Sequence, residues 1–130
     1  FHFEKALYEN PDQDLNTLWW DMAERFQGLK RPAGRNAPDW ASKIHFSIAP
    51  VYYHNYQLGE LFAAQLRSVL VKLANHQGPA HTLKYTGNKA FGNYLKEKIF
   101  KPGMTLPWPQ FIEKATGEPL TAKYFAQEVK

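Results

Sequence analysis

The sequence contains no cysteine, and this absence excludes several classes of protein. A zinc ribbon, a disulfide-stapled miniprotein and a thiol-dependent enzyme all need cysteine side chains. No stretch approaches the roughly 18 consecutive apolar residues of a membrane-spanning helix, so we expect no membrane segment. Excess charge of either sign is also small, because 16 Lys and Arg stand against 12 Asp and Glu. Since the basic residues are scattered along the chain, we predict no nucleic-acid partner.

Recognisable catalytic motifs are missing as well. The five histidines form no H-E-x-x-H pair, and no glycine-rich phosphate loop occurs. We therefore predict no metal site and no cofactor in the chain itself. What the sequence has in quantity is apolar and aromatic residues, with four Trp, seven Tyr and nine Phe among 130 residues. This composition excludes intrinsic disorder and is enough for one hydrophobic core.

Apolar residues recur at helical spacing through most of the chain. Asn10-Pro11-Asp12-Gln13 combines a capping residue with a proline, which predicts a helix start, and an apolar stripe follows as far as Phe26. Gly28 is the predicted end of this helix. The longest helix is predicted over residues 51–74, with Pro50 available for its first position.

The other segments complete an all-helical pattern. Further helices are predicted over residues 1–7, 88–100, 108–117 and from Thr121 onward. Residues 29–43 are typical of a loop, and residues 44–47 are compatible with an extended segment. No strand-like alternation exceeds four residues. The sequence therefore predicts an all-α fold, with residues 1–130 as a single helical region.

Residues 43–56 concentrate side chains that can bind or polarise a substrate. Lys43 can hold a carboxylate, and imidazole and phenol groups can donate hydrogen bonds to a developing oxyanion. Tyr53 and Tyr56 are three residues apart, which places them on one face of a helix. The alternative is structural: the tyrosines are amphipathic core residues with hydroxyls in water, and His45 is a loop histidine.

This segment and its flanks resemble the C-terminal part of the angiotensin-converting enzyme family, which are zinc-dependent dipeptidyl carboxypeptidases. The resemblance follows nearly the whole chain in order, through Trp19-Trp20, Gln27-Gly28-Leu29, Lys43-Ile44-His45, Tyr53-His54-Asn55-Tyr56, His76-Gln77-Gly78-Pro79, Pro107-Trp108-Pro109 and Thr116-Gly117-Glu118-Pro119. The pair of tyrosines around His-Asn is similar to bacterial rather than animal members. The resemblance implies the helical C-terminal part of a larger, mostly helical metallopeptidase domain.

The resemblance also implies roles for individual residues. Lys43 would bind the terminal carboxylate of the substrate, with Tyr53 as a second carboxylate partner. Tyr52 is the alternative to Tyr53, because the spacing from His45 is one residue longer here than in the animal enzymes. His45 and Tyr56 would be catalytic, since they would donate to the substrate carbonyl and to the oxyanion that forms from it.

In this family the zinc ligands and the general base lie upstream, on an H-E-x-x-H helix and a later glutamate. The resemblance therefore implies zinc in the parent protein but none in this chain, which alone should be inactive. Its implied partners are a peptide with a free C-terminus and the rest of the parent chain. We also expect self-association of the fragment, because its central helix would expose apolar side chains.

Two further expectations follow from the resemblance. The family is mostly exported, which suggests a periplasmic or extracellular location. The alternative function is a non-catalytic helical module that binds a peptide or a protein, which would include a pseudoenzyme of the same fold.

Overall fold

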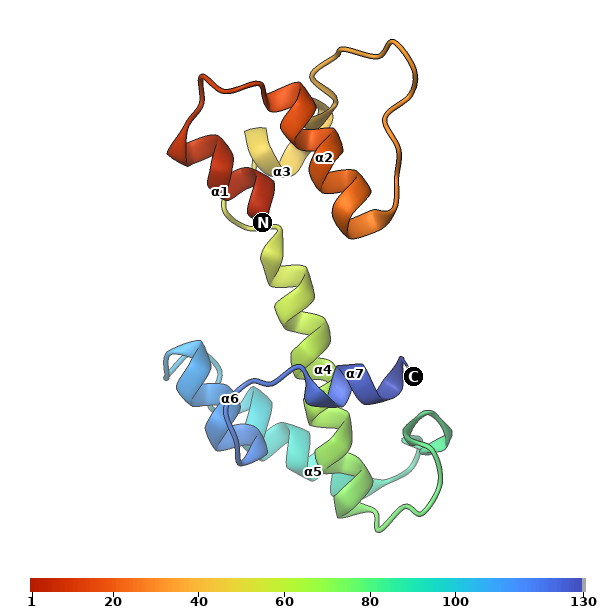
Figure 1. Ribbon diagram of the computed structural model, residues 1–130. Coiled ribbons are helices and arrows are strands. Elements are labelled where there is room, and N and C mark those ends of the chain that lie inside the picture. Colours follow the sequence, from red (N-terminus) through yellow and green to blue (C-terminus); the bar gives the residue numbers. More distant parts are fainter. Residues whose placement is uncertain (130) are drawn as a thin grey trace. The chain divides into compact units, whose positions relative to one another are not determined.

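The computed structural model describes residues 1–129, and every regular element in this range is helical (Figure 1). The elements are α1 (His2–Glu9), α2 (Leu15–Gln27), η1 (Asp39–Ser42), α3 (Ile44–Ser47), α4 (His54–Leu73), η2 (Ala80–Thr82), α5 (Lys89–Leu95), η3 (Lys96–Phe100), α6 (Trp108–Thr116) and α7 (Lys123–Glu128). The prediction of an all-α fold is therefore confirmed. The chain divides into two compact units, Phe1–Tyr56 and a second that begins at Gln57, and each is described by itself.

The first unit packs around Phe3 of α1, which is 4% exposed. Its ring centroid lies 5.2 Å from that of Trp19 on α2, 5.7 Å from that of Trp40 in η1, and 5.3 Å from that of Phe46 on α3. The rings meet edge-on or tilted, which are favourable arrangements for aromatic pairs. This aromatic cluster joins α1, α2, η1 and α3, each of which is too short to be stable alone.

The start of α2 differs from the prediction. Asn10-Pro11-Asp12-Gln13 is not helical, and Asp14 caps α2 instead, because its Oδ1 accepts the Thr17 N–H at 3.0 Å. Hydrogen bonds from the backbone and hydroxyl of Thr17 lower the pKa of Asp14. The Gln13 side chain binds the end of α1: its Nε2 donates to the Ala6 carbonyl at 2.8 Å and to the Asn10 carbonyl at 2.7 Å.

Two boundaries near the candidate residues also differ. Residues 44–47, which are compatible with an extended segment, form the single helical turn α3. The helix expected from residue 51 begins only at His54, because Val51 has a φ of 56° and a left-handed residue cannot continue an α-helix. The prediction that α2 ends at Gly28 is confirmed, and Gly28 supplies a φ of 69° there.

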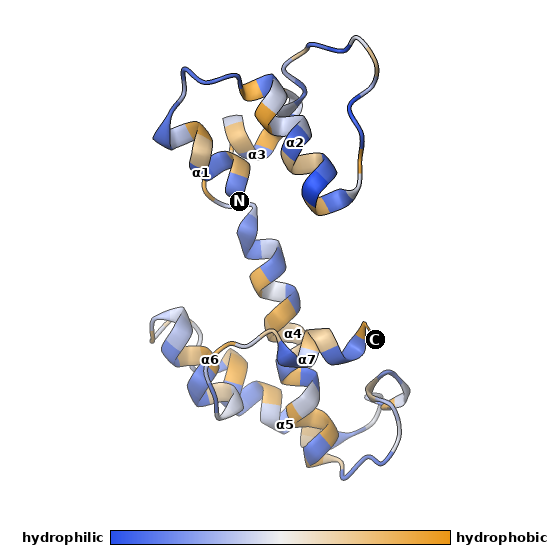
Figure 2. Ribbon diagram, viewed as in Figure 1, coloured by the Kyte–Doolittle hydropathy of each residue, from blue (hydrophilic) through white to orange (hydrophobic). Residues whose placement is uncertain are grey.

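The helices of the second unit lie close to their predicted positions. Residues 88–100 form α5 followed by the π-helical η3, and the side chain of Asn88 caps the start. Gly117 ends α6 with a φ of 89°. The last helix begins at Lys123, where the Thr121 hydroxyl accepts the Lys123 N–H at 3.3 Å. Figure 2 shows hydrophobic and hydrophilic bands alternating along α4. Within residues 1–129 no helix is long and apolar enough to cross a membrane.

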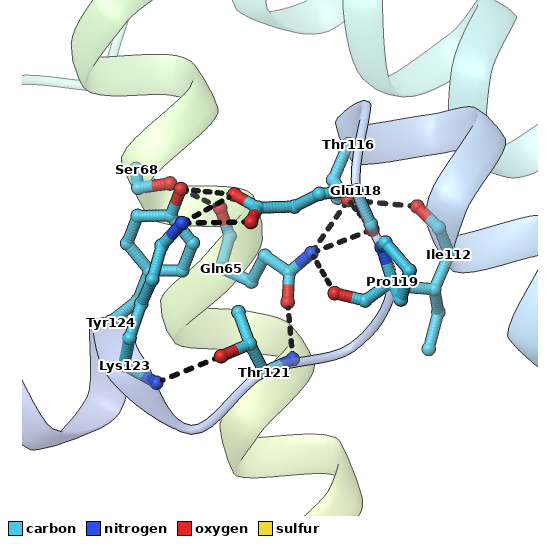
Figure 3. Close-up of polar contacts among 9 residues, drawn as sticks. All are labelled: Gln65, Ser68, Ile112, Thr116, Glu118, Pro119, Thr121, Lys123 and Tyr124. Carbon is cyan, nitrogen blue, oxygen red and sulfur yellow. Dashed lines mark hydrogen bonds and ion pairs between the residues drawn. The ribbon is translucent and has the colours of Figure 1, made fainter.

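Gln65 of α4 is fully buried and organises the second unit (Figure 3). Its Nε2 donates to Thr116 Oγ1 at 2.8 Å and to the carbonyls of Glu118 at 3.0 Å and Pro119 at 3.2 Å. Its Oε1 accepts the Thr121 N–H at 3.0 Å. Because a buried amide is costly unless paired, this one side chain holds the segment between α6 and α7 against α4.

We predict that Gln65→Ala lowers the free energy of unfolding by about 3 kcal/mol or more, because it opens a cavity and leaves buried backbone groups unpaired. Urea unfolding followed by circular dichroism measures the change. Gln57→Ala is the matched control, since Gln57 is exposed on the same helix, and it should change the free energy by less than about 0.5 kcal/mol. Equal losses in the two variants would contradict this account of Gln65.

Candidate functional site

The first unit brings His45, Tyr53 and Tyr56 together where α3 leads into α4. The His45 and Tyr53 rings are stacked, with centroids 4.2 Å apart and an interplanar angle of 24°. Tyr56 meets both rings edge-on, at 5.7 Å from His45 and 5.6 Å from Tyr53. Tyr53 is 52% exposed and Tyr56 is 60% exposed, so these tyrosines lie at the surface and not in the core. Their hydroxyls are accessible to a ligand.

Local structure explains why His45 faces this group. Lys43 is extended and precedes the single turn of α3, and its carbonyl accepts the Phe46 N–H at 3.0 Å. The Phe46 ring is fixed in the aromatic cluster by its contact with Phe3. The packing of Phe46 therefore fixes α3, which carries His45 and follows directly on the exposed Lys43.

The first unit contains a groove with a volume of about 980 Å³, and of the three rings Tyr53 lines it, whereas His45 and Tyr56 do not. Lys43 and Tyr53 both line it. Much of its wall is aromatic, with Phe1, Phe3, Trp19, Trp20, Phe26 and Phe46. A mostly apolar groove whose wall also carries a lysine and a phenol suits a ligand with an apolar body and a carboxylate.

The geometry distinguishes Tyr53 from the alternative, Tyr52. Tyr53 stacks on His45 and lines the same groove as Lys43. Tyr52 instead meets the ring of Tyr56 edge-on, with centroids 6.3 Å apart. Of the two tyrosines, Tyr53 is thus the one that shares a wall with the lysine.

Part of the groove wall comes from the long loop before α3, and a charged pair fixes it. Arg35 Nε donates to Asp39 Oδ2 at 2.8 Å, and Trp20 Nε1 of α2 donates to the same oxygen at 3.2 Å. The Arg35 hydrogen bond is the main reason that the pKa of Asp39 lies below its usual value, and the same bond raises the pKa of Arg35. Asp39 therefore ties the loop to α2.

Two residues that the sequence analysis did not single out also shape the site. Glu4 of α1 is 4% exposed, and its Oε1 accepts the Val51 N–H at 2.5 Å. Val51 is the left-handed residue just before Tyr52. No local pattern marks Glu4, because the group it binds lies 47 residues further along the chain.

The described residues do not fit a zinc site. Within residues 1–129, no group of three or more histidine, aspartate and glutamate side chains is placed to hold a metal ion. A catalytic zinc usually takes three protein ligands of these types. What residues 43–56 offer is a cation and a set of hydrogen-bond donors, which can bind a carboxylate and a polarised carbonyl.

Comparison with known proteins gives matches along most of the chain. The sequence model of the peptidase family described as angiotensin-converting enzyme matches residues 6–126. The chain is 32% identical over 108 residues to angiotensin-converting enzyme of Oryctolagus cuniculus, a match that covers 82% of this chain and 8% of that protein. For angiotensin-converting enzyme of Theromyzon tessulatum the identity is 30% over 118 residues, covering 88% of this chain and 19% of the relative.

A third relative is the angiotensin-converting enzyme-like protein Ace3 of Mus musculus, 33% identical over 104 residues, which cover 79% of this chain and 14% of that protein. The chain thus spans less than a fifth of the length of these three relatives. No solved structure matches the chain significantly.

We predict that acid loosens the groove wall. Because the folded pKa of Asp39 is below its unfolded value, its stabilising effect is present above about pH 4 and is lost as the pH falls through the folded pKa. The Trp20 indole N–H signal, followed by NMR during acid titration, should report this loss. Asp39→Asn should remove the transition, whereas Asp21→Asn, at an exposed position of α2, should keep it. A wild-type indole signal that does not respond to acid before global unfolding would contradict the role of Asp39.

Proposed function

This chain belongs to the angiotensin-converting enzyme family of peptidases, and from that premise we propose that it is the C-terminal part of a zinc-dependent peptidyl-dipeptidase. Such an enzyme removes dipeptides from the C-termini of peptides. The observation that carries the proposal is the contact of His45 and Tyr56 with Tyr53, which lines the same groove as Lys43. Zinc and its ligands would belong to the rest of the parent protein, and this chain alone would be inactive.

Lys43 and Tyr53 have the geometry for the carboxylate-binding part of this function. Both line the groove, and both are exposed, so a peptide terminus can reach them. An ammonium group and a phenol hydroxyl can together satisfy the oxygens of one carboxylate. A free C-terminus would then be held at a fixed distance from His45 and Tyr56, which would place the second peptide bond from the end at the reacting position.

His45 and Tyr56 would serve the reaction itself. Their rings meet at a centroid distance of 5.7 Å and an angle of 88°, so an imidazole N–H and a phenol O–H can approach the same small region. When a carbonyl is attacked, negative charge develops on its oxygen, and fixed donors stabilise that charge. We assign both side chains to this oxyanion, while water activation would depend on groups outside this chain.

We predict that Tyr56→Phe, introduced into the complete peptidase, lowers kcat by about 10²–10³-fold with little change in KM, because the lost donor acts mainly on the transition state. Steady-state hydrolysis of a short peptide measures both constants. Tyr52→Phe is the matched control, and its kcat should stay close to the wild-type value. Equal losses of kcat in the two variants would contradict the assignment of Tyr56.

We predict that Lys43→Ala raises KM for peptides with a free C-terminus by about 10–100-fold, the value of one hydrogen bond to a charged group. The preference for free over amidated peptides should fall by the same factor. Lys30→Ala, at an exposed position of the long loop, is the control and should preserve this preference. An unchanged preference in Lys43→Ala would show that the carboxylate binds elsewhere.

The alternative function is a non-catalytic peptide-binding module. The rest of the polypeptide distinguishes this alternative from the peptidase. If the complete protein carries an H-E-x-x-H helix and hydrolyses peptides, the peptidase proposal stands. If it has no zinc motif but retains the preference for peptides with a free C-terminus, the carboxylate assignment stands and the catalytic assignments fall.

A further inference from the structure

We infer that Glu4 is a positioning residue for the ring group: its carboxyl group fixes the turn at Val51, and this turn sets Tyr53 and Tyr56 against His45. The functional meaning of this inference rests on the proposed function, since the rings are the proposed substrate-binding and oxyanion-binding groups. The placement itself rests only on contacts within the first unit.

Glu4 is a buried carboxyl group on α1. It is 4% exposed, although it lies on a short amphipathic helix whose other glutamate, Glu9, is exposed and paired with Lys5. A buried carboxyl group is costly unless it is hydrogen-bonded. Glu4 meets this requirement through the Val51 N–H, whose nitrogen lies 2.5 Å from its Oε1. The helix therefore presents an acceptor to a segment far along the chain.

Val51 has an unusual backbone conformation. Its φ is 56°, a left-handed value that is rare for any residue with a side chain and exceptional for a β-branched one. Val51 is 61% exposed, so burial of this residue does not explain its conformation. Strained backbone of this kind persists only where the surrounding structure holds it. The hydrogen bond to Glu4 is the contact that holds the Val51 backbone.

The turn at Val51 connects the two segments that carry the rings. Val51 stands between α3, which carries His45, and the start of α4, which carries Tyr56. A rotation about its φ moves everything that follows relative to α3. The stack of His45 on Tyr53, with centroids 4.2 Å apart, requires this angle to stay fixed. Because productive sites need placement within about 0.5 Å, a relaxed turn would separate the donors from each other.

The direct test is NMR of the 130-residue chain with Glu4→Leu, which keeps a side chain of similar size but removes the acceptor, and Glu4→Gln, which keeps an acceptor oxygen. We expect ring-to-ring NOEs between His45 and Tyr53 in the wild type and in Glu4→Gln, and their loss in Glu4→Leu. Glu9→Leu, at the exposed glutamate of the same helix, is the matched control and should keep the NOEs. Persistence of the stack in Glu4→Leu would overturn the inference.

Substitutions at Val51 keep the inference testable if Glu4→Leu does not fold. Val51→Pro fixes φ near −65° and removes the N–H without disturbing the core, so the ring NOEs should disappear even though Glu4 is intact. Glycine adopts a left-handed φ without steric cost and keeps the N–H that Glu4 accepts, so Val51→Gly should retain the stack. An intact stack in Val51→Pro would show that the turn does not position the rings.

The same variants distinguish this inference from the proposed function. The NOEs need no activity, so their loss in Glu4→Leu supports the positioning role even if the complete polypeptide hydrolyses no peptide. In an active peptidase, Glu4→Leu should both raise KM and lower kcat, because it displaces Tyr53 and Tyr56 together. Activity in the complete protein combined with unchanged NOEs in Glu4→Leu would retain the function and reject the role of Glu4.

Discussion

The hydrogen bond from the Val51 N–H to the buried carboxyl group of Glu4 is the contact on which the arrangement of the candidate site depends. It joins α1 to the turn before α4 and holds a valine in a left-handed conformation. Gln65 has a comparable place in the second unit, where it pairs with the backbone of a distant segment. In both units a buried polar side chain fixes an irregular connection, because leaving such a group unpaired costs more than ordering its partner.

The chemistry proposed for the chain divides between anchoring and stabilisation. Lys43 and Tyr53 line a mostly apolar groove, which suits recognition of a carboxylate next to apolar groups. His45 and Tyr56 meet each other edge-on, both contact Tyr53, and both offer donors to a carbonyl oxygen. The described residues fit no zinc site, and in the proposed function the metal would be held outside this chain, whose own residues would hold a peptide and stabilise charge. Because the chain belongs to the angiotensin-converting enzyme family, we interpret both proposed roles as those of a peptidase.

The sequence predicted those helix boundaries that depend only on neighbouring residues. The end of α2 at Gly28 followed from the sequence because glycine tolerates a left-handed φ, and α6 likewise ends at Gly117. The start of α2 was misplaced because Asp14 lies just after another sequence with capping residues and forms the bond to Thr17. Pro50 suits a helix start, but the conformation of Val51 is tied to a partner 47 residues away, which no window of sequence contains.

The candidate site was likewise predicted only in part from the sequence. The spacing of Tyr53 and Tyr56 predicted that they share one face of a helix. Their rings do lie close, with centroids 5.6 Å apart, but Tyr53 precedes α4 and its ring stacks on His45. The resemblance to a peptidase family supplied the proposed roles, whereas the groove and Glu4 emerged only from the tertiary contacts of α1, α2 and the loop before α3. These features depend on contacts of Phe3 with residues far along the chain. The periodicity of apolar residues in the sequence does not reveal such contacts.

The most direct measurement of the central claim is a crystal structure of the complete polypeptide with a dipeptide product that has a free carboxylate. We expect the carboxylate to lie within hydrogen-bond distance, about 2.7–3.2 Å, of Lys43 Nζ and the Tyr53 hydroxyl. We also expect the end of the dipeptide formed by cleavage to point toward His45 and Tyr56. A dipeptide whose carboxylate is bound by other residues, with Lys43 and Tyr53 free, would contradict the account.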